Sequence, residues 1–314
     1  MLTSETTTAV MPDSRPAYRP FRASVVRVVR LSPHFSRVTF TGPDFATFGA
    51  HGLDQRINLI FPLEGIGLSD CGWDDEQPLA DGYWYSRWRE LPNELRNPLR
   101  VYTVRAVRPA ERELDVDFVV HGDGAAARWL AAAVPGDEIV VIGPDALSEK
   151  SRLGIDWHPG EAATLLLVGD ETAAPAIAGI LASLPADKSA YAIIEIPHES
   201  DALDVDSGGN VTVQWVPRDG GDPGSTLLPA VQAWVSERPE LVGAALAPRT
   251  QQFEEAAELL WESPDSVGDA GLYAWVAGEA GAITSIRRYL VRDVGIDRGQ
   301  VAFMGYWRRG KSQN

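Results

Sequence analysis

"ATLLLVGDE" (residues 163–171) divides this sequence into two kinds of fold. It is a continuous apolar run ending in Gly169, which is typical of a strand buried on both faces of a parallel sheet. The segment after it places Ile177, Ile180 and Leu181 at helical spacing. A buried strand followed directly by a helix predicts the start of an α/β domain.

The same alternation continues to the C-terminus. Buried strands and helices that follow one another predict a parallel, doubly wound sheet, an NAD(P)-binding-like domain with a C-terminal tail over residues 163–314. The further predicted strands are "AYAIIEIP" (190–197), "NVTVQWVP" (210–217) and "LYAWVAGEA" (272–280), and the predicted helices are "STLLPAVQAWVSE" (225–237), "QQFEEAAELLWES" (251–263) and "AITSIRRYLVRD" (282–293).

Upstream of residue 163 the apolar residues alternate with period two instead. Short strands of this kind, separated by Gly, Pro or charged turns, predict an antiparallel six-stranded β-barrel over residues 18–145. The six are "ASVVRVVRLS" (23–32), "SRVTFTG" (36–42), "QRINLIFPL" (55–63), "LRVYTVRAVR" (99–108), "LDVDFVVHG" (114–122) and "DEIVVIGP" (137–144).

Three other segments complete the predicted organisation. Residues 64–98 hold three tryptophans, and we expect an excursion packed on the barrel and helical in part at "YSRWRELPNEL". Residues 1–17 are polar and predict a disordered lead-in. Residues 146–162 predict the linker between the domains.

Composition excludes several classes of protein. The 314 residues carry a formal charge of −16, which disfavours nucleic acid and anionic membranes as partners. Cys71 is the single cysteine, the five histidines are scattered, and no apolar run reaches the roughly 18 residues of a membrane span. We therefore expect a cytoplasmic protein without a protein-bound metal, whose oligomeric state the sequence leaves open.

The strand "RVYTVR" carries the first candidate site. Alternate strand residues share a face, so Arg100 and Tyr102 project together. An arginine can pair with a phosphate and a phenol ring can cover an isoalloxazine, which suits a flat redox cofactor. A surface strand with solvated arginines is the alternative. The candidate cofactor contacts here are Arg100, Tyr102, Thr103, Val104 and Arg105.

"VVHGDGAAARWLAAAVPGD" (119–137) predicts a strand, a glycine-bearing turn and a helix that begins with small residues. Such a helix N-terminus can bind a pyrophosphate through its backbone N–H groups. The alternatives are an ordinary alanine-rich connector helix and a structural histidine. The candidate contacts are His121, Gly122, Gly124, Ala125, Ala126 and the nearby Trp129.

Two strand ends in the second domain share a glycine–acid pair. "VGDETAAP" is not a G-x-G-x-x-G fingerprint, and its carboxylates would repel a diphosphate although they favour a helix N-terminus. We expect a nucleotide crevice there, or acids that simply cap helices, while Glu195 either bonds a ribose or faces solvent. The candidates are Gly169, Asp170, Glu171, Thr172, Gly278 and Glu279.

The C-terminal "MGYWRRGKSQN" combines aromatic and basic residues. Tyr306 and Trp307 are candidates to cover a flavin or nucleotide. A solvated basic tail after a final strand is the alternative to a site for an anionic substrate. The candidate substrate contacts are Arg128, Arg308, Arg309 and Lys311.

These motifs together resemble a known family. "RVYTVR" resembles the flavin motif of the ferredoxin reductase superfamily, in the extended form of the siderophore-interacting proteins, which are FAD-dependent ferric-siderophore reductases. "HGDGAAARWLAAAVPGD", "VGDETAAPAI", "YAWVAGEAGAITSIRRYL" and "MGYWRRG" resemble further stretches of that family, in the same order from about residue 20 to residue 310.

The resemblance implies FAD as cofactor, NADPH or NADH as electron donor and a ferric siderophore as substrate. It implies that Arg100 and Arg105 bind FAD phosphates, that Tyr102 lies against the flavin and that Thr103 approaches its N5 edge. No side chain is expected to be catalytic. One departure is the turn, where Gly124-Ala125-Ala126-Ala127 replaces the family's Gly-Pro-Ala and lacks its frequent serine.

Two other functions stay open at this stage. One is a siderophore- or flavin-binding protein without turnover. The other is a flavoprotein reductase that serves a redox protein such as a ferredoxin, which the large negative charge disfavours because ferredoxins are usually acidic.

Overall fold

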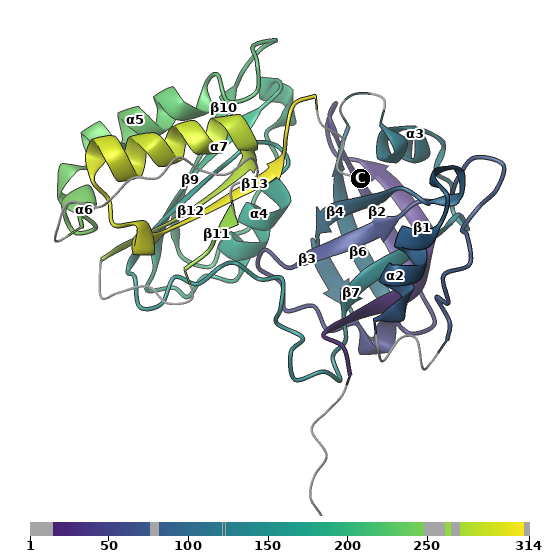
Figure 1. Cartoon of the computed structure of the whole chain (residues 1–314). Coiled ribbons are helices and arrows are strands. Elements are labelled where there is room, and N and C mark those ends of the chain that lie inside the picture. The colour runs from purple at the N-terminus through teal and green to yellow at the C-terminus, as the bar shows by residue number, and fades with distance from the viewer. Residues whose placement is uncertain are drawn as a thin grey trace, which may run out of the picture.

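The structure is a computed structural model that describes residues 15–75, 82–120, 122, 124–247, 261–264 and 271–310. It contains two sheets, each with its own core (Figure 1). An antiparallel sheet precedes an α/β domain in the chain, so the predicted fold class is confirmed.

The first sheet has seven strands in the order β4-β3-β7-β1-β2-β6-β5. Its inward residues, among them Phe21, Val38, Ile57 and Phe118, form one buried core. The strands are β1 (Tyr18–Arg30), β2 (Phe35–Thr41), β3 (Arg56–Ile60), β4 (Leu99–Thr103), β5 (Ala106–Arg108), β6 (Glu113–Val119) and β7 (Glu138–Pro144).

The prediction of six strands was wrong in one place. "LRVYTVRAVR" is two strands, because the chain changes partner between Val104 and Arg105. The Val104 N–H donates to the carbonyl of Gln55 (2.9 Å), whereas the Arg105 N–H donates to that of Asp115 (2.9 Å). The two outer strands of the sheet, β4 and β5, therefore follow each other directly in the chain.

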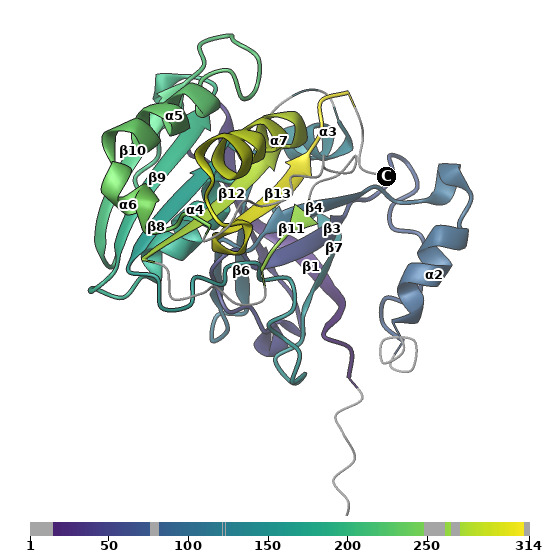
Figure 2. The same cartoon turned by 60° about the vertical axis from the view of Figure 1, so that its left-hand side comes forward.

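The excursion packs on the barrel through its aromatic residues. Trp73, Trp84 and Trp88 are buried together with Cys71 against Ile60 and the outer face of β7. Its helix α2 (Tyr83–Glu90) stands beside the barrel in Figure 2, as expected from the sequence. A one-turn helix at Asn93–Leu95 follows it, and another, Phe45–Thr47, lies between β2 and β3.

The second sheet has the order β10-β9-β8-β12-β13-β11. Five strands are parallel, and β11 pairs antiparallel with β13 at the edge. The strands are β8 (Thr164–Gly169), β9 (Ser189–Ile196), β10 (Asn210–Pro217), β11 (Trp261–Glu262), β12 (Leu272–Glu279) and β13 (Val301–Trp307).

Helices cover both faces of this sheet. Leu165 and Leu167 pack against the helix α4, whereas Leu166 and Val168 pack against α5 and α7, as period two requires of a strand buried on both faces. The helices are α3 (Ala125–Ala132) in the barrel domain, then α4 (Ala174–Ala182), α5 (Leu227–Glu237), α6 (Pro239–Gly243) and α7 (Ala280–Arg287), with shorter turns at Glu199–Asp201 and Arg298–Gln300 and a π-helical continuation of α7 at Arg288–Val294.

The helix predicted over residues 251–263 was wrong at its end. Trp261 and Glu262 pair with Met304 and Phe303 as a short strand, because they add to the open edge of β13. Residues 251–260 lie outside the described part of the chain.

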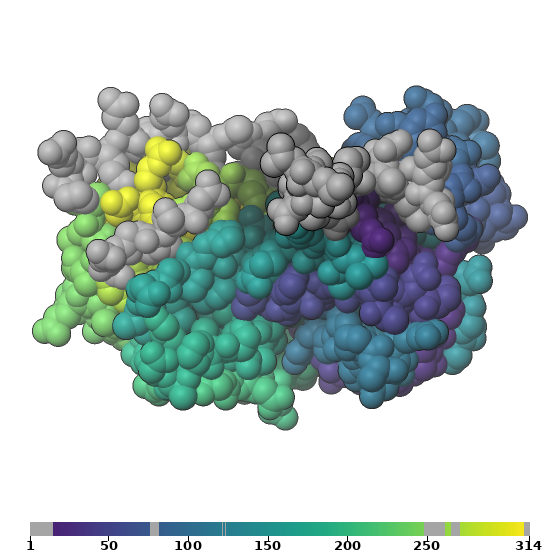
Figure 3. All heavy atoms as spheres, turned by 90° about the horizontal axis from the view of Figure 1, so that it is seen from below, coloured from purple at the N-terminus to yellow at the C-terminus, as the bar shows by residue number. Residues whose placement is uncertain are grey.

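The two domains share an interface with a large apolar cluster. Phe35, Leu53 and Val119 of the barrel belong to the same apolar cluster as α4. At Gly179 the helix approaches so closely that a Cβ would lie 2.5 Å from the carbonyl oxygen of Leu53. Figure 3 shows the teal middle of the chain pressed against the purple N-terminal strands. Within the described residues, no helix is long and apolar enough to cross a membrane.

Candidate functional site

Strand β4 places Arg100 and Tyr102 on the inward face of the barrel, as predicted. Tyr102 packs against Phe118, with ring centroids 4.5 Å apart, and burial raises the pKa of its hydroxyl. The Arg100 Nη1 donates to the carbonyl of Leu99 (2.8 Å), and desolvation lowers the pKa of its guanidinium. The attraction between a phosphate and a partly desolvated arginine is stronger than that between a phosphate and an arginine in water.

Trp129 of α3 joins the same wall. Its ring lies 5.2 Å from Phe61, 5.8 Å from Phe118 and 6.1 Å from Phe40. Tyr102 and Trp129, chosen from the sequence as separate contacts, are therefore two members of one aromatic cluster. Such a cluster offers a flat apolar surface on which an isoalloxazine can stack.

The remaining predicted contacts of this strand have other partners. Thr103 and Val104 are buried, and the Val104 N–H is used in the barrel. The Arg105 Nε lies 3.6 Å from Asp117 Oδ2, and Asp117 also pairs with Arg37 at 2.7 Å. Arg105 would therefore share its charge between Asp117 and any phosphate.

The turn before α3 has the predicted form. Gly122 adopts a φ of 64°, and Gly124 is the N-cap of α3 without a side-chain cap. Among the described residues, no atom lies within 4 Å of a Cβ added at either glycine, so none of them fills the space before the helix. Ala125 and Ala126 form its first turn, which has no acidic residue. His121 lies outside the described residues.

These residues fit an FAD. An open helix N-terminus suits a pyrophosphate, an aromatic wall suits the ring system, and Arg100 lies on the same face as the tyrosine. Strand β4 and the turn before α3, which are about twenty residues apart in the sequence, thus belong to one face of the barrel. We retain all of these contacts as predictions.

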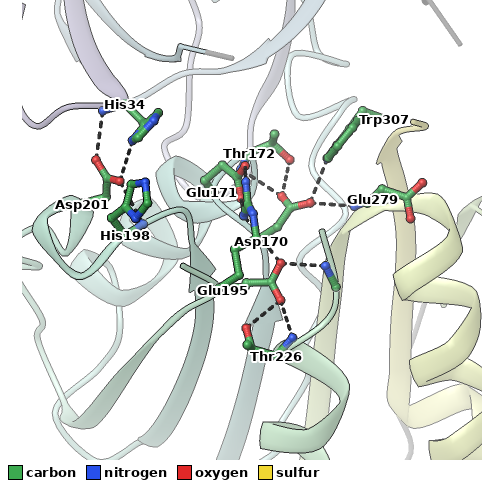
Figure 4. Close-up of polar contacts among 12 residues, drawn as sticks. His34, Asp170, Glu171, Thr172, Glu195, His198, Asp201, Thr226, Glu279 and Trp307 are labelled. Carbon is green, nitrogen blue, oxygen red and sulfur yellow. Dashed lines mark hydrogen bonds and ion pairs between the residues drawn. The ribbon is translucent and has the colours of Figure 1, made fainter. Parts of the chain in front are cut away.

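The carboxyl edge of the second sheet is crowded with acids (Figure 4). Asp170 is buried and accepts hydrogen bonds from the Thr172 N–H (2.9 Å), the Glu279 N–H (2.7 Å) and the Trp307 Nε1 (2.8 Å). Desolvation, and then the neighbouring Glu171, raise the pKa of Asp170 to about 6. Gly278 has a φ of 149°, and a Cβ there would lie 2.7 Å from Asp170 Oδ2.

The two glycine–acid pairs therefore do meet, but their acids also have local partners. Glu279 caps α7 by accepting from the Ala282 N–H (2.9 Å). Gly169 lies close to Ala173. A Cβ added at Gly169 would be 2.5 Å from the Cβ of Ala173. The capping expectation holds for Glu279 alone, because α4 begins without a side-chain cap and Asp170 bonds instead to Thr172, Glu279 and Trp307. The nucleotide crevice stays a prediction.

The expectation for Glu195 was wrong. It neither faces solvent nor is available to a ribose, because it is fully buried under the start of α5. Its carboxylate accepts from the N–H groups of Gly224 (2.7 Å), Thr226 (2.9 Å) and Leu227 (3.0 Å) and from the Thr226 hydroxyl. Thr226 lies 31 residues after Glu195, so no local sequence signal shows that Glu195 caps α5.

The C-terminal aromatics are also engaged. Tyr306 stacks on Trp261, with centroids 5.9 Å apart and planes at 18°, and Trp307 bonds to Asp170. Arg309 pairs with Asp222 at 2.6 Å on the surface. In Figures 1 and 2 the chain leaving β13 runs toward the end of the barrel that α3 covers. Arg128 is exposed on α3, Arg308 is half-buried, and Lys311 lies outside the described residues.

A buried acid that the sequence did not indicate joins the two domains. Asp54 Oδ2 accepts from the Trp275 Nε1 (3.1 Å) of β12 and from the Asp156 N–H (3.1 Å). Its Oδ1 is buried and has no hydrogen-bond partner in the part of the chain that the structure describes. Desolvation, and then the nearby Asp156, raise the pKa of Asp54 from 3.8 to about 6.

This shift predicts a pH-dependent stability. Because the folded pKa is raised, ionised Asp54 costs stability, and that cost appears as pH rises from about 4 through 6. It amounts to roughly 3 kcal/mol above that range. We expect the free energy of unfolding of Asp54→Asn, minus that of wild type, to rise by up to this amount between pH 4 and pH 7. Urea unfolding across this range checks it, and a constant difference would refute it.

A second polar tie lies at the other end of the interface. Asp201, buried in the α/β domain, accepts from the Ser32 hydroxyl (2.7 Å) and the His34 N–H (2.9 Å) of the barrel and contacts His34 Nδ1 (2.7 Å) (Figure 4). Burial alone would raise its pKa, but the hydrogen bonds from Ser32 and His34 hold that pKa below its ordinary value. The carbonyl of His34 accepts from Val120, so this tie adjoins the strand that leads into the glycine turn.

Two family models cover most of the chain. Residues 24–148 match the siderophore-interacting FAD-binding domain, and residues 162–310 match the siderophore-interacting protein domain. The barrel therefore matches the siderophore-interacting FAD-binding domain family. The chain belongs to the siderophore-interacting protein family.

Relatives match over nearly full length. An uncharacterised protein of Mycobacterium tuberculosis is 32% identical over 302 residues, 95% of this chain and 93% of that one. The ferric vibriobactin reductase of Vibrio cholerae is 27% identical, with 92% of this chain and 89% of that one covered. The NADPH-dependent ferric-chelate reductase of Escherichia coli is 31% identical over 154 residues, 49% of this chain and 53% of that one.

Solved structures agree on the fold. A siderophore utilization protein from T. fusca superposes with a TM-score of 0.68 and 28% identity, covering 96% of this chain and 97% of that one. The ferredoxin reductase in carbazole 1,9a-dioxygenase has a TM-score of 0.58 at 15% identity, covering 93% of this chain and 71% of that one.

Proposed function

We propose that this protein takes electrons from a nicotinamide dinucleotide and delivers them through FAD to the iron of a ferric siderophore. The observation that supports it best is the inward face of the barrel, where Arg100, Tyr102 and the open start of α3 lie in the domain that matches a siderophore-interacting FAD-binding model. The reductase relative from Vibrio cholerae supports the same reaction class. We place the reaction in the cytoplasm, where both dinucleotides are available.

Bound FAD would supply the conversion of a two-electron donor into one-electron steps, which side chains cannot perform. The chain would contribute binding and orientation. Arg100 would hold a phosphate, the first turn of α3 would hold the pyrophosphate, and Tyr102 with Trp129 would cover one side of the ring system. Iron leaves most siderophores more readily as Fe(II), so reduction would release it.

The substrate would approach at the side where α3 and the end of β13 lie. Arg128 and Arg308 are basic groups there in a strongly acidic protein, which suits an anionic chelate. Arg309 lies in the same segment, and its guanidinium pairs with Asp222 at 2.6 Å on the surface.

A binding protein without turnover is the second candidate, and the acids at the carboxyl edge favour it. Asp170, Glu171 and Glu279 lie where a doubly wound domain would hold a diphosphate, and like charges disfavour that ligand. The two candidates predict opposite results in one assay.

The assay supplies full-length flavin-loaded protein with NADH or NADPH and a ferric siderophore, without oxygen, and traps Fe(II) with a ferrous chelator. We expect nucleotide oxidation and Fe(II) formation that both depend on the flavin. Siderophore binding without Fe(II) formation from either nucleotide would reject the reductase and support the binding protein.

A further inference from the structure

The carboxyl ends of β9 and β10 carry two groups that normally decide between the nicotinamide dinucleotides. In doubly wound domains an acid at the end of the second strand bonds the ribose 2′-hydroxyl of NAD, while an arginine nearby accommodates the 2′-phosphate of NADP. Here the second strand ends at Glu195-Ile196 and its parallel neighbour is followed by Arg218, with Pro217 in register with Ile196.

Neither group is available for its usual task. Glu195 caps α5. Both terminal nitrogens of Arg218 donate to Glu171, at 2.6 and 2.7 Å, and Nη1 also lies 3.6 Å from Glu195. The Glu171 side chain is 2% exposed and that of Arg218 is 12% exposed. A bidentate pair of this kind uses the guanidinium edge that would otherwise bind a phosphate.

The loop after β9 adds negative charge to this edge of the sheet. The loop 197–209 after β9 contains Glu199, Asp201, Asp204 and Asp206 and no lysine or arginine. Asp219 follows Arg218 and contacts His198 at 3.4 Å. A ribose 2′-phosphate carries up to two further negative charges, and placing it beside fixed carboxylates is unfavourable.

We propose that Glu171, by holding Arg218, makes this domain select NADH over NADPH. The inference rests on the proposed function, in which a nicotinamide dinucleotide is the donor. The Escherichia coli relative bears NADPH in its name. The proposed preference for NADH is therefore argued from this chain's own residues and not from its relatives. Glu171 acts on specificity through Arg218 and takes no part in electron transfer.

The test measures binding rather than turnover. NAD⁺ and NADP⁺ are titrated calorimetrically into full-length, flavin-loaded protein. We expect NADP⁺ to bind at least about 10-fold more weakly than NAD⁺ to the wild type, a difference of about 1.4 kcal/mol. In Glu171→Gln the neutral amide offers Arg218 one acceptor oxygen in place of two, so one guanidinium N–H group becomes available to the ligand, and the ratio of the two dissociation constants should move toward NADP⁺ by about 10-fold or more.

The matched control is Glu199→Gln. It removes one negative charge from the same edge at an exposed side chain and leaves the Glu171–Arg218 pair in place. It should change the ratio less than about 3-fold, as a screened surface charge does. In Glu171→Gln, Glu195 still faces Arg218, so the guanidinium keeps a buried counter-charge and the variant should fold.

Three results would overturn the inference: wild type that binds NADP⁺ as tightly as NAD⁺, a ratio unchanged in Glu171→Gln, or an equal change in both variants. The wild-type ratio needs no substitution and stands even if a variant fails to fold. Reversed preference with normal flavin reduction would reject this inference alone. Flavin that neither nucleotide reduces, despite the expected binding ratio, would reject the proposed function alone.

Discussion

Replacing Arg100 with alanine is expected to weaken FAD binding roughly 10- to 100-fold, because a charge-assisted hydrogen bond to a phosphate contributes about 1.5–3 kcal/mol. Arg100 lies beside Tyr102 on the inward face of β4, and burial already destabilises its charge, so a bound anion compensates it. Titration of FAD into flavin-stripped protein, followed by flavin fluorescence, measures the change.

Riboflavin supplies the internal control, since it has the ring system without phosphates. Its affinity should be the same for wild type and Arg100→Ala. Arg89→Ala, at an exposed position on α2, should leave the affinity for both flavins unchanged. If Arg100→Ala lowered riboflavin and FAD affinity equally, the arginine would support the fold of the site and would not bind the phosphate.

Replacing Arg218 with methionine is expected to destabilise the protein by about 3–5 kcal/mol at neutral pH, since it leaves buried carboxylates without their counter-charge. Glu195 would keep its N–H donors, but Glu171 would lose both of its hydrogen bonds from Arg218. Urea unfolding at neutral pH measures the loss.

Arg309→Met is the matched control for that variant. Its partner Asp222 is 74% exposed and Arg309 itself is 66% exposed, so the pair contributes at most about 1 kcal/mol. Equal destabilisation by the two substitutions would show that the burial of the Glu171–Arg218 pair does not matter.

Much of the fold follows from local patterns. Period-two alternation marks the barrel strands, and "ATLLLVGDE" marks the change to a parallel sheet, because a strand buried on both faces has no polar alternation. The glycine turn before α3 was also readable, since Gly122 needs a positive φ and Gly124 precedes the helix. The aromatic cluster around Tyr102 was not, because it unites residues from three separate strands, the residue after a fourth strand and a helix.

The missed residues depend on distant partners. Arg218 and Glu171 are 47 residues apart, and Asp54 and Trp275 are 221 apart. The split of "LRVYTVRAVR" likewise depends on which strand edge each N–H meets. Arg218, directly after β10, was a local signal of the network of acids around it. Its significance appears only once Glu171 is known to face it.

The most direct test of the electron route is a single turnover without oxygen. Protein whose bound flavin has been reduced beforehand is mixed with a ferric siderophore, and the absorbance of flavin and of trapped Fe(II) is followed. The account predicts that the oxidised flavin bands return while about two Fe(II) form per flavin, as a two-electron to one-electron converter requires. Flavin that stays reduced in the presence of bound siderophore would contradict it.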